Sequence, residues 1–177
     1  MSENDLAQDP RAVEVSHPDT HYQVQCAEVR LVSSRLKPLP ESADLEASRF
    51  VFKIEAYIQG NTALSHLHVQ VISVEDGAEE TQGSYELRFT LAGVFVAEGE
   101  IQPEALANFA RMYTLSILWP YAREYTADQL RRAGQPTDAL PIINPQVVTE
   151  KLIDADLVEI KIISEDVASA ATTQAAE

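Results

Sequence analysis

Apolar and polar side chains alternate along much of the first hundred residues. The alternation covers four runs, 22–31, 50–58, 67–71 and 85–91, and a period of two predicts strands that bury one face and expose the other. The apolar positions change parity near 27–28, which predicts a bulge in the first strand. Because no helical pattern separates the four runs, we expect them to form an antiparallel sheet.

Prolines and glycines mark the breaks between these runs. Pro38 and Pro40 cannot both sit inside a paired strand, so we expect a leucine-rich connection over about 36–48. Gly60 breaks the second run before the third begins, and a longer polar loop is expected over 74–84. The breaks therefore separate each predicted strand from the next.

Helical periodicity replaces the alternation after Pro103, a residue that the first turn of a helix tolerates. Pro120 interrupts this pattern, so we expect a bend or a restart there and a second helix over about 120–133. Gly134 supplies the C-cap of that helix.

The end of the chain predicts two more elements and a tail. A short helix is expected over 146–153, and the run 157–163 alternates enough to be a strand, with a continued helix as the alternative. Polar sequence at the two ends predicts a flexible arm over 1–20 and a disordered tail over 164–177, which an Ala-rich frayed helix could replace. One domain over 21–163 is long enough to bury a core.

Charge and cysteine content narrow the class of partner. The chain has 28 acidic against 13 basic residues, a net charge of −15, whereas nucleic acid and anionic membranes require a positive footprint. The charge serves solubility, and it would also suit basic unfolded chains. A single cysteine forms no intrachain disulfide, and the polar N-terminus predicts no secretory signal, so we expect a cytoplasmic protein without membrane insertion.

No catalytic signature is recognisable in the sequence, so we expect no enzyme activity and no cofactor. Gly-rich phosphate loops, His-Glu-x-x-His and Gly-x-Ser-x-Gly are all absent. His66 and His68 lie two apart on one predicted strand and share a face, but without a Cys or His companion we read them as exposed histidines and expect no metal. This pair is the sole support for a small-ligand binder or an enzyme. Cys26 reads as a small core or half-buried residue.

Residues 117–124, Ile-Leu-Trp-Pro-Tyr-Ala-Arg-Glu, resemble the Ile-Leu-Phe-Pro-Tyr-Ala-Arg-Glu signature of the SecB family of export chaperones. Seven of the eight positions are identical, and a Trp replaces the Phe. Weaker landmarks at 22–25, 91–95 and 134–145 follow in the family's order. The resemblance covers roughly residues 20–153.

The resemblance implies an α+β fold with a four-stranded antiparallel sheet, helices packed on one face, and assembly as a dimer of dimers. It implies an ATP-independent holdase that keeps unfolded or precursor polypeptides translocation-competent for protein export. The implied oligomer interface on the helix consists of Trp119, Tyr121, Arg123, Glu124 and Tyr125.

The resemblance also implies that client chains lie in long apolar grooves. One wall would come from the connection after the first strand, with Leu36, Leu39 and Leu45. The other would come from the loop and second helix, with Leu140, Ile142, Ile143, Val147, Val148 and Leu152. Such grooves bind hydrophobic stretches largely regardless of sequence, and many weak sites give avidity for a long client.

The chain departs from the family where export chaperones dock on the SecA motor. That docking uses three carboxylates on the sheet face, and here Leu31, Arg35 and Arg88 stand at those positions, unless the register shifts and Glu28 substitutes. Loss of charge complementarity removes the basis for SecA docking. A SecB-like chaperone dedicated to another client, such as the antitoxin of a toxin–antitoxin pair, is therefore the alternative. The segment 154–163 also extends beyond the family's usual acidic tail.

Overall fold

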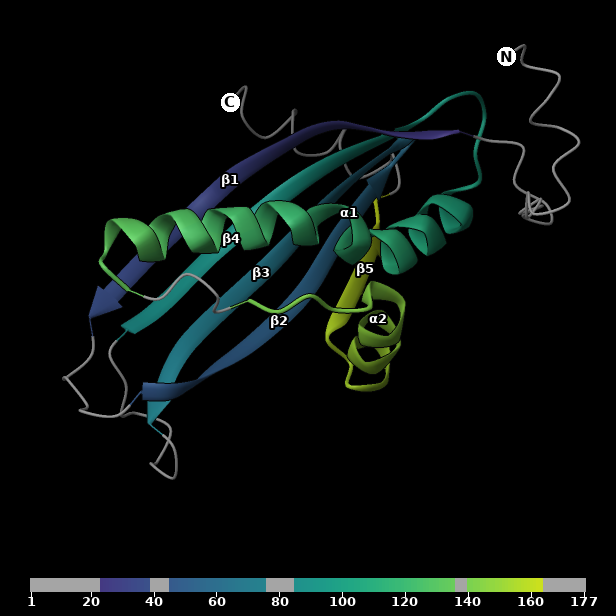
Figure 1. Ribbon diagram of the computed structural model, residues 1–177. Helices are drawn as coiled ribbons and strands as arrows, with labels where there is room; N and C mark the ends of the chain where they lie inside the picture. The colour runs from purple at the N-terminus through teal and green to yellow at the C-terminus, as the bar shows by residue number, and fades with distance from the viewer. Residues whose placement is uncertain (1–22, 39–44, 76–84, 136–139, 164–177) are drawn as a thin grey trace, which may run out of the picture.

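The computed structural model describes residues 23–38, 45–75, 85–135 and 140–163 (Figure 1). The predicted arm and tail lie outside these residues. In chain order the elements are β1 (Val24–Pro38), β2 (Leu45–Gln59), β3 (Thr62–Glu75), β4 (Tyr85–Ala97), α1 (Pro103–Arg132), α2 (Pro145–Asp154) and β5 (Val158–Ile162). This order confirms an α+β chain in which four strands precede the helices.

The five strands form one sheet in the order β1-β4-β3-β2-β5. The first four pair antiparallel, as expected, but β5 pairs parallel to β2 along Ile54 to Ile58. The four expected antiparallel strands are therefore confirmed, but a fifth strand makes the sheet mixed and not purely antiparallel. The physical reason is that the chain returns through two helices and reaches the open edge of β2 in the same direction. The reading of 157–163 as a strand is confirmed.

Strand β1 is irregular and largely exposed. Its register shifts between Cys26 and Glu28, which confirms the bulge predicted near 27–28, and shifts again between Leu31 and Ser33. Cys26 beside the first bulge is exposed, so the reading of it as a core or half-buried residue is wrong.

A two-residue turn joins β2 to β3. Gln59 pairs with Thr62, so that Gly60 and Asn61 alone lie outside the ladder. Gly60 has a φ of 54°, a left-handed value that suits glycine because it has no Cβ. This tight connection sets the register of the hairpin. A residue a given number of positions before the turn on β2 faces the residue the same number of positions after the turn on β3.

Helix α1 runs without a break through Pro120 and bends part-way along (Figure 1). Of the two alternatives predicted there, the bend agrees with the structure, whereas the restart and the separate helix over 120–133 are wrong. Trp119 and Ala122, on either side of the proline, are both buried. Their packing holds the helix together despite the hydrogen bond that Pro120 cannot donate. The helix ends where predicted, since Gly134 follows its C-cap with a φ of 70°.

Helix α2 begins at a capped N-terminus. The side-chain oxygen of Asn144 accepts hydrogen bonds from the backbone N–H groups of Gln146 at 3.1 Å and Val147 at 3.5 Å. Pro145 fits the first turn because its missing N–H would have no intrahelical partner there. The helix confirms the one predicted over 146–153.

The helices pack on one face of the sheet, which we call the core face. The larger core cluster joins strands to both helices and includes Phe52, Leu67, Phe89, Leu118, Leu130 and Leu152. The opposite face, which we call the polar face, carries Lys53, Glu55, His66, His68, Gln70, Arg88 and Thr90. Within the described residues no helix is long and apolar enough to cross a membrane.

Substitution of Gly93 by alanine is expected to destabilise the fold by about 1–3 kcal/mol. Gly93 lies in β4, and a Cβ there would come within 2.9 Å of Phe95 Cζ and 3.0 Å of Leu118 Cδ2. Urea unfolding measures the loss. The penalty should shrink when Phe95→Leu makes room for the methyl group; an equal penalty in both backgrounds would contradict this steric explanation.

Candidate functional site

A hollow of about 310 Å³ lies between β1 and the C-terminal half of α1. We call it the β1–α1 hollow, and its lining is Val29, Arg30, Leu31, Leu91, Tyr121, Glu124, Tyr125 and Asp128. The floor is apolar and the rim carries charges of both signs. Leu31 and Tyr121 are nearly half exposed, at 45% and 47%, so the hollow presents apolar surface to the solvent.

The aromatic side chains of α1 have different surroundings. Tyr125 is half-buried and packs on Phe89 of β4, with ring centroids 4.9 Å apart. Trp119, one turn and a half earlier, is 4% exposed and packs on Phe52 of β2 at 5.2 Å. Tyr121 points away from this core and is exposed. The helix therefore anchors to the sheet through Trp119 and Tyr125 and offers Tyr121 for contacts.

The segment before α2 is attached to α1 by two side-chain hydrogen bonds. Trp119 Nε1 donates to the carbonyl oxygen of Pro141, and Arg123 Nε donates to that of Leu140, both at 3.3 Å. Held in this way, the segment exposes Ile142 to 84%. An isoleucine so exposed next to a fixed backbone is available to a partner.

The predicted groove residues fall into four groups. Leu140 and Leu152 are buried in the core, while Leu36, Ile143 and Val148 are half-buried against it. Ile142 and Val147 are exposed, whereas Leu39 and the side chain of Leu45 lie outside the described residues. Leu36 lies in β1 and Leu45 opens β2, so the connection expected over 36–48 is shorter than predicted, because Pro38 at a strand end disrupts no interior pairing.

The predicted interface residues also divide by exposure. Trp119 is buried and Tyr125 half-buried within this chain, whereas Tyr121, Arg123 and Glu124 are exposed. The exposed Arg123 is also held within the chain, because its Nε donates to the carbonyl oxygen of Leu140.

A second hollow, of about 380 Å³, lies on the polar face across β1 to β4. Arg35 of β1 and Arg88 of β4 are directly opposite each other there, and Glu86 receives a hydrogen bond from Arg88 Nε at 2.6 Å. Leu31 lies in the β1–α1 hollow, on the side that α1 covers. Of the three positions where export chaperones carry docking carboxylates, Arg35 and Arg88 therefore form a cation pair on the polar face. Leu31 lies on the core face.

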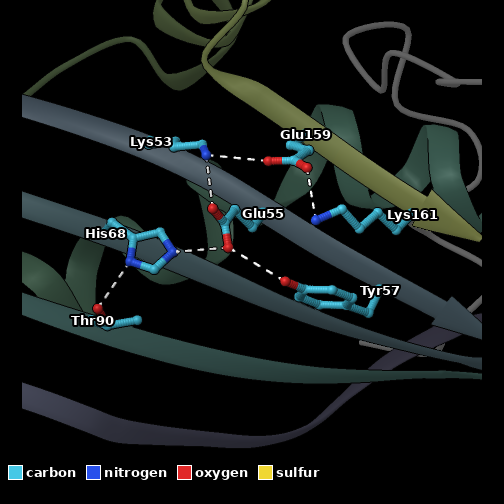
Figure 2. A network of polar contacts seen from close by, with 7 residues as sticks. All are labelled: Lys53, Glu55, Tyr57, His68, Thr90, Glu159 and Lys161. Atoms are coloured by element: carbon cyan, nitrogen blue, oxygen red, sulfur yellow. Dashed lines mark hydrogen bonds and ion pairs between the residues drawn. The ribbon is translucent and has the colours of Figure 1, made fainter.

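A chain of charges ties β5 to β2 (Figure 2). Lys53 Nζ lies 2.7 Å from a Glu55 oxygen and 3.2 Å from a Glu159 oxygen, and Lys161 Nζ lies 2.7 Å from Glu159. The hydrogen bond from Lys53 lowers the pKa of Glu55, and that from Lys161 lowers the pKa of Glu159. The last strand is thus joined to the sheet by side chains as well as by backbone.

The two histidines lie beside this chain of charges. His68 Nδ1 is 3.0 Å from Thr90 Oγ1, and His68 Nε2 is 3.5 Å from Glu55 Oε2 (Figure 2). Burial, and then the neighbouring His68, lower the pKa of His66. The sequence interpretation missed Glu55, although counting back from the Gly60 turn places it opposite His66.

Among the comparisons with known proteins, only the comparison with solved structures found a match. No protein-family model matches the chain, and no curated protein matches it. Solved structures do match, and they share the SecB-like chaperone fold.

One such structure is the SecB-like chaperone Rv1957 of Mycobacterium tuberculosis, solved in complex with a ChAD peptide from the HigA1 antitoxin Rv1956. It is 21% identical in sequence, with a TM-score of 0.54, and the match covers 68% of this chain and 91% of that one. The likeness confirms the SecB-like fold that residues 117–124 indicate.

Proposed function

We propose that this protein is an ATP-independent holdase chaperone that binds unfolded segments of client polypeptides and catalyses no reaction. The observation that carries the proposal is apolar surface exposed on both sides of the C-terminal half of α1. Leu31 exposes it in the β1–α1 hollow, and Ile142 and Val147 expose it beyond the opposite side of the helix. Such surface binds apolar client stretches largely regardless of their sequence, because their transfer from water is favourable.

The residues of α2 and of the segment before it have different roles in the proposed client binding. Ile142 and Val147 contact the client, Ile143 and Val148 lie half-buried behind them, and Leu140 fixes the wall to the core. Full burial of one aliphatic side chain contributes about 1.5–3 kcal/mol. A single contact is therefore weak, and a long client is held by many of them together.

Strand β1 offers backbone groups for the same task. Within the described sheet it pairs only with β4, so its outer N–H and C=O groups are open to an extended client or to a second copy of β1. We assign the exposed Tyr121 and Glu124 of α1 to contacts between chains, in a homo-oligomer built as a dimer of dimers in the cytoplasm.

We infer a dedicated client, such as an antitoxin segment, in preference to SecA-linked export. Rv1957 was solved with an antitoxin peptide, and the cation pair Arg35–Arg88 stands where docking on SecA would require carboxylates. Keeping precursor polypeptides translocation-competent is the second candidate function. It is favoured by the signature at 117–124, and it requires other residues to engage SecA.

The purified chain, at severalfold excess and without nucleotide, should suppress aggregation of a denatured model substrate. Light scattering measures the effect, and unchanged aggregation would contradict the holdase proposal. A pulldown that compares purified SecA with antitoxin-derived peptides separates the two clients: retention of a peptide but not of SecA supports the dedicated client, and the reverse result supports export.

A further inference from the structure

Three potential metal ligands converge on the polar face of the sheet. Glu55 of β2 and His66 and His68 of β3 each offer one ligand atom, and these atoms all lie within 4.8 Å of one another. The cluster lies on the face opposite α1, so it is separate from the proposed client surface. Two imidazoles with one carboxylate form a donor set that divalent transition metals bind readily.

The backbone brings these three side chains together without strain. His66 and His68 lie two residues apart on β3, so their side chains emerge on the same face, with ring centroids 6.0 Å apart. Glu55 is the direct cross-strand partner of His66, and Lys53 is that of His68. The two-residue turn at Gly60 fixes this register, so the three ligands sit on a rigid hairpin.

His68 is oriented as a metal ligand would be. Its Nδ1 is 3.0 Å from Thr90 Oγ1, a hydrogen bond that fixes the ring, while its Nε2 is buried and has no hydrogen-bond partner. When neutral His68 donates Nδ1–H to Thr90, Nε2 and Glu55 Oε2 are two electron-pair donors facing each other at 3.5 Å. In this tautomer both atoms would attract a cation placed between them.

We propose that Glu55, His66 and His68 bind one divalent transition-metal ion of the zinc class, with water completing the coordination shell. Ligand atoms about 2.0–2.1 Å from a tetrahedral metal are about 3.4 Å apart. The 3.5 Å between His68 Nε2 and Glu55 Oε2 already matches that spacing. The ligand atom of His66 lies within 4.8 Å of the other two, so a side-chain rotation is sufficient to bring it to the same spacing.

Some of the charges around the cluster oppose a bound cation, and others favour it. Lys53 holds one oxygen of Glu55, and Arg30 of β1 raises the local positive potential at His66; both oppose a bound cation. Glu159 draws Lys53 toward β5, which leaves Glu55 Oε2 to face His68 and the Tyr57 hydroxyl.

Titration of the full chain with Zn²⁺ in a calorimeter tests the site, because the sequence contains a matched control. The chain has four histidines, His17, His21, His66 and His68. We expect one Zn²⁺ per chain on the hairpin, at least tenfold weaker binding in the double variant His66→Gln/His68→Gln, and unchanged binding in His17→Gln/His21→Gln. Circular dichroism checks that both variants keep the wild-type fold.

Lys53→Met provides a second, opposite test. Removal of the ammonium group frees Glu55 from its cation, so Zn²⁺ should bind more tightly than to the wild type, and Co²⁺ should give the visible absorption of a four-coordinate ion. Absence of Zn²⁺ binding by the wild-type chain, equal binding by His66→Gln/His68→Gln, or loss of binding in His17→Gln/His21→Gln would each overturn the proposal.

Discussion

Replacement of Trp119 by alanine should lower the free energy of unfolding by about 3–5 kcal/mol. The indole is 4% exposed, packs on Phe52 of β2 with centroids 5.2 Å apart, and donates Nε1–H to the carbonyl oxygen of Pro141 at 3.3 Å. The substitution therefore removes a large buried ring at the centre of the larger core cluster. It also releases one of the two bonds that hold the segment before α2.

Trp119→Phe is the matched control, because the SecB signature carries phenylalanine at this position. Phenylalanine keeps most of the packing and loses the hydrogen bond, so we expect it to cost about 1 kcal/mol. Urea unfolding of the three proteins gives the comparison. Equal costs for alanine and phenylalanine would mean that the hydrogen bond to Pro141, and not the packing, dominates.

The double substitution Ile142→Asp/Val147→Asp should weaken client binding about 100-fold. Two aliphatic contacts, at about 1.5 kcal/mol or more each, account for that factor, because about 1.4 kcal/mol corresponds to tenfold in affinity. Folding should be little affected, since Ile142 is 84% exposed and Val147 is 45% exposed. Fluorescence anisotropy of a labelled unfolded client measures the dissociation constant.

Val51→Asp controls for the added charge, because Val51 is 50% exposed on the polar face of β2 and away from α1. Client affinity should stay within about twofold of the wild type in this variant. If Val51→Asp weakened binding as much as the double substitution, the polar face would be the client surface, and the assignment to Ile142 and Val147 would fail.

Local sequence patterns were sufficient for most of the elements. Alternation gave the four antiparallel strands, and the parity change near 27–28 gave the bulge beside Cys26. Signals at the ends of α1 worked for the same reason, because they act within one turn: Pro103 begins the helix, and Gly134 follows it. The signature at 117–124 then indicated the SecB-like fold, which the solved structures confirm.

The structure differs from the predictions where contacts between residues far apart in the sequence determine the fold. The sequence predicts a bend or a restart at Pro120 with a separate helix over 120–133, but the burial of Trp119 and Ala122 against the sheet keeps α1 one continuous, bent helix. No local pattern indicates that β5 pairs with β2, or in which direction. The alternation within β2 does not show which residue of β3 faces Glu55; the pairing of the two strands places it opposite His66.

The short strand β5 has a consequence for assembly. It covers the β2 edge with five residues, and its Lys161 ammonium group lies 5.4 Å from the centre of the Tyr57 ring. A short, charged edge is a poor template for further strands, whereas β1 extends over 15 residues. Two chains joined through β1 would carry a β5 at each outer end of the shared sheet. The sheet would therefore stop growing at a symmetric pair and would not continue into a fibre, and larger assemblies would have to form through other surfaces, such as α1.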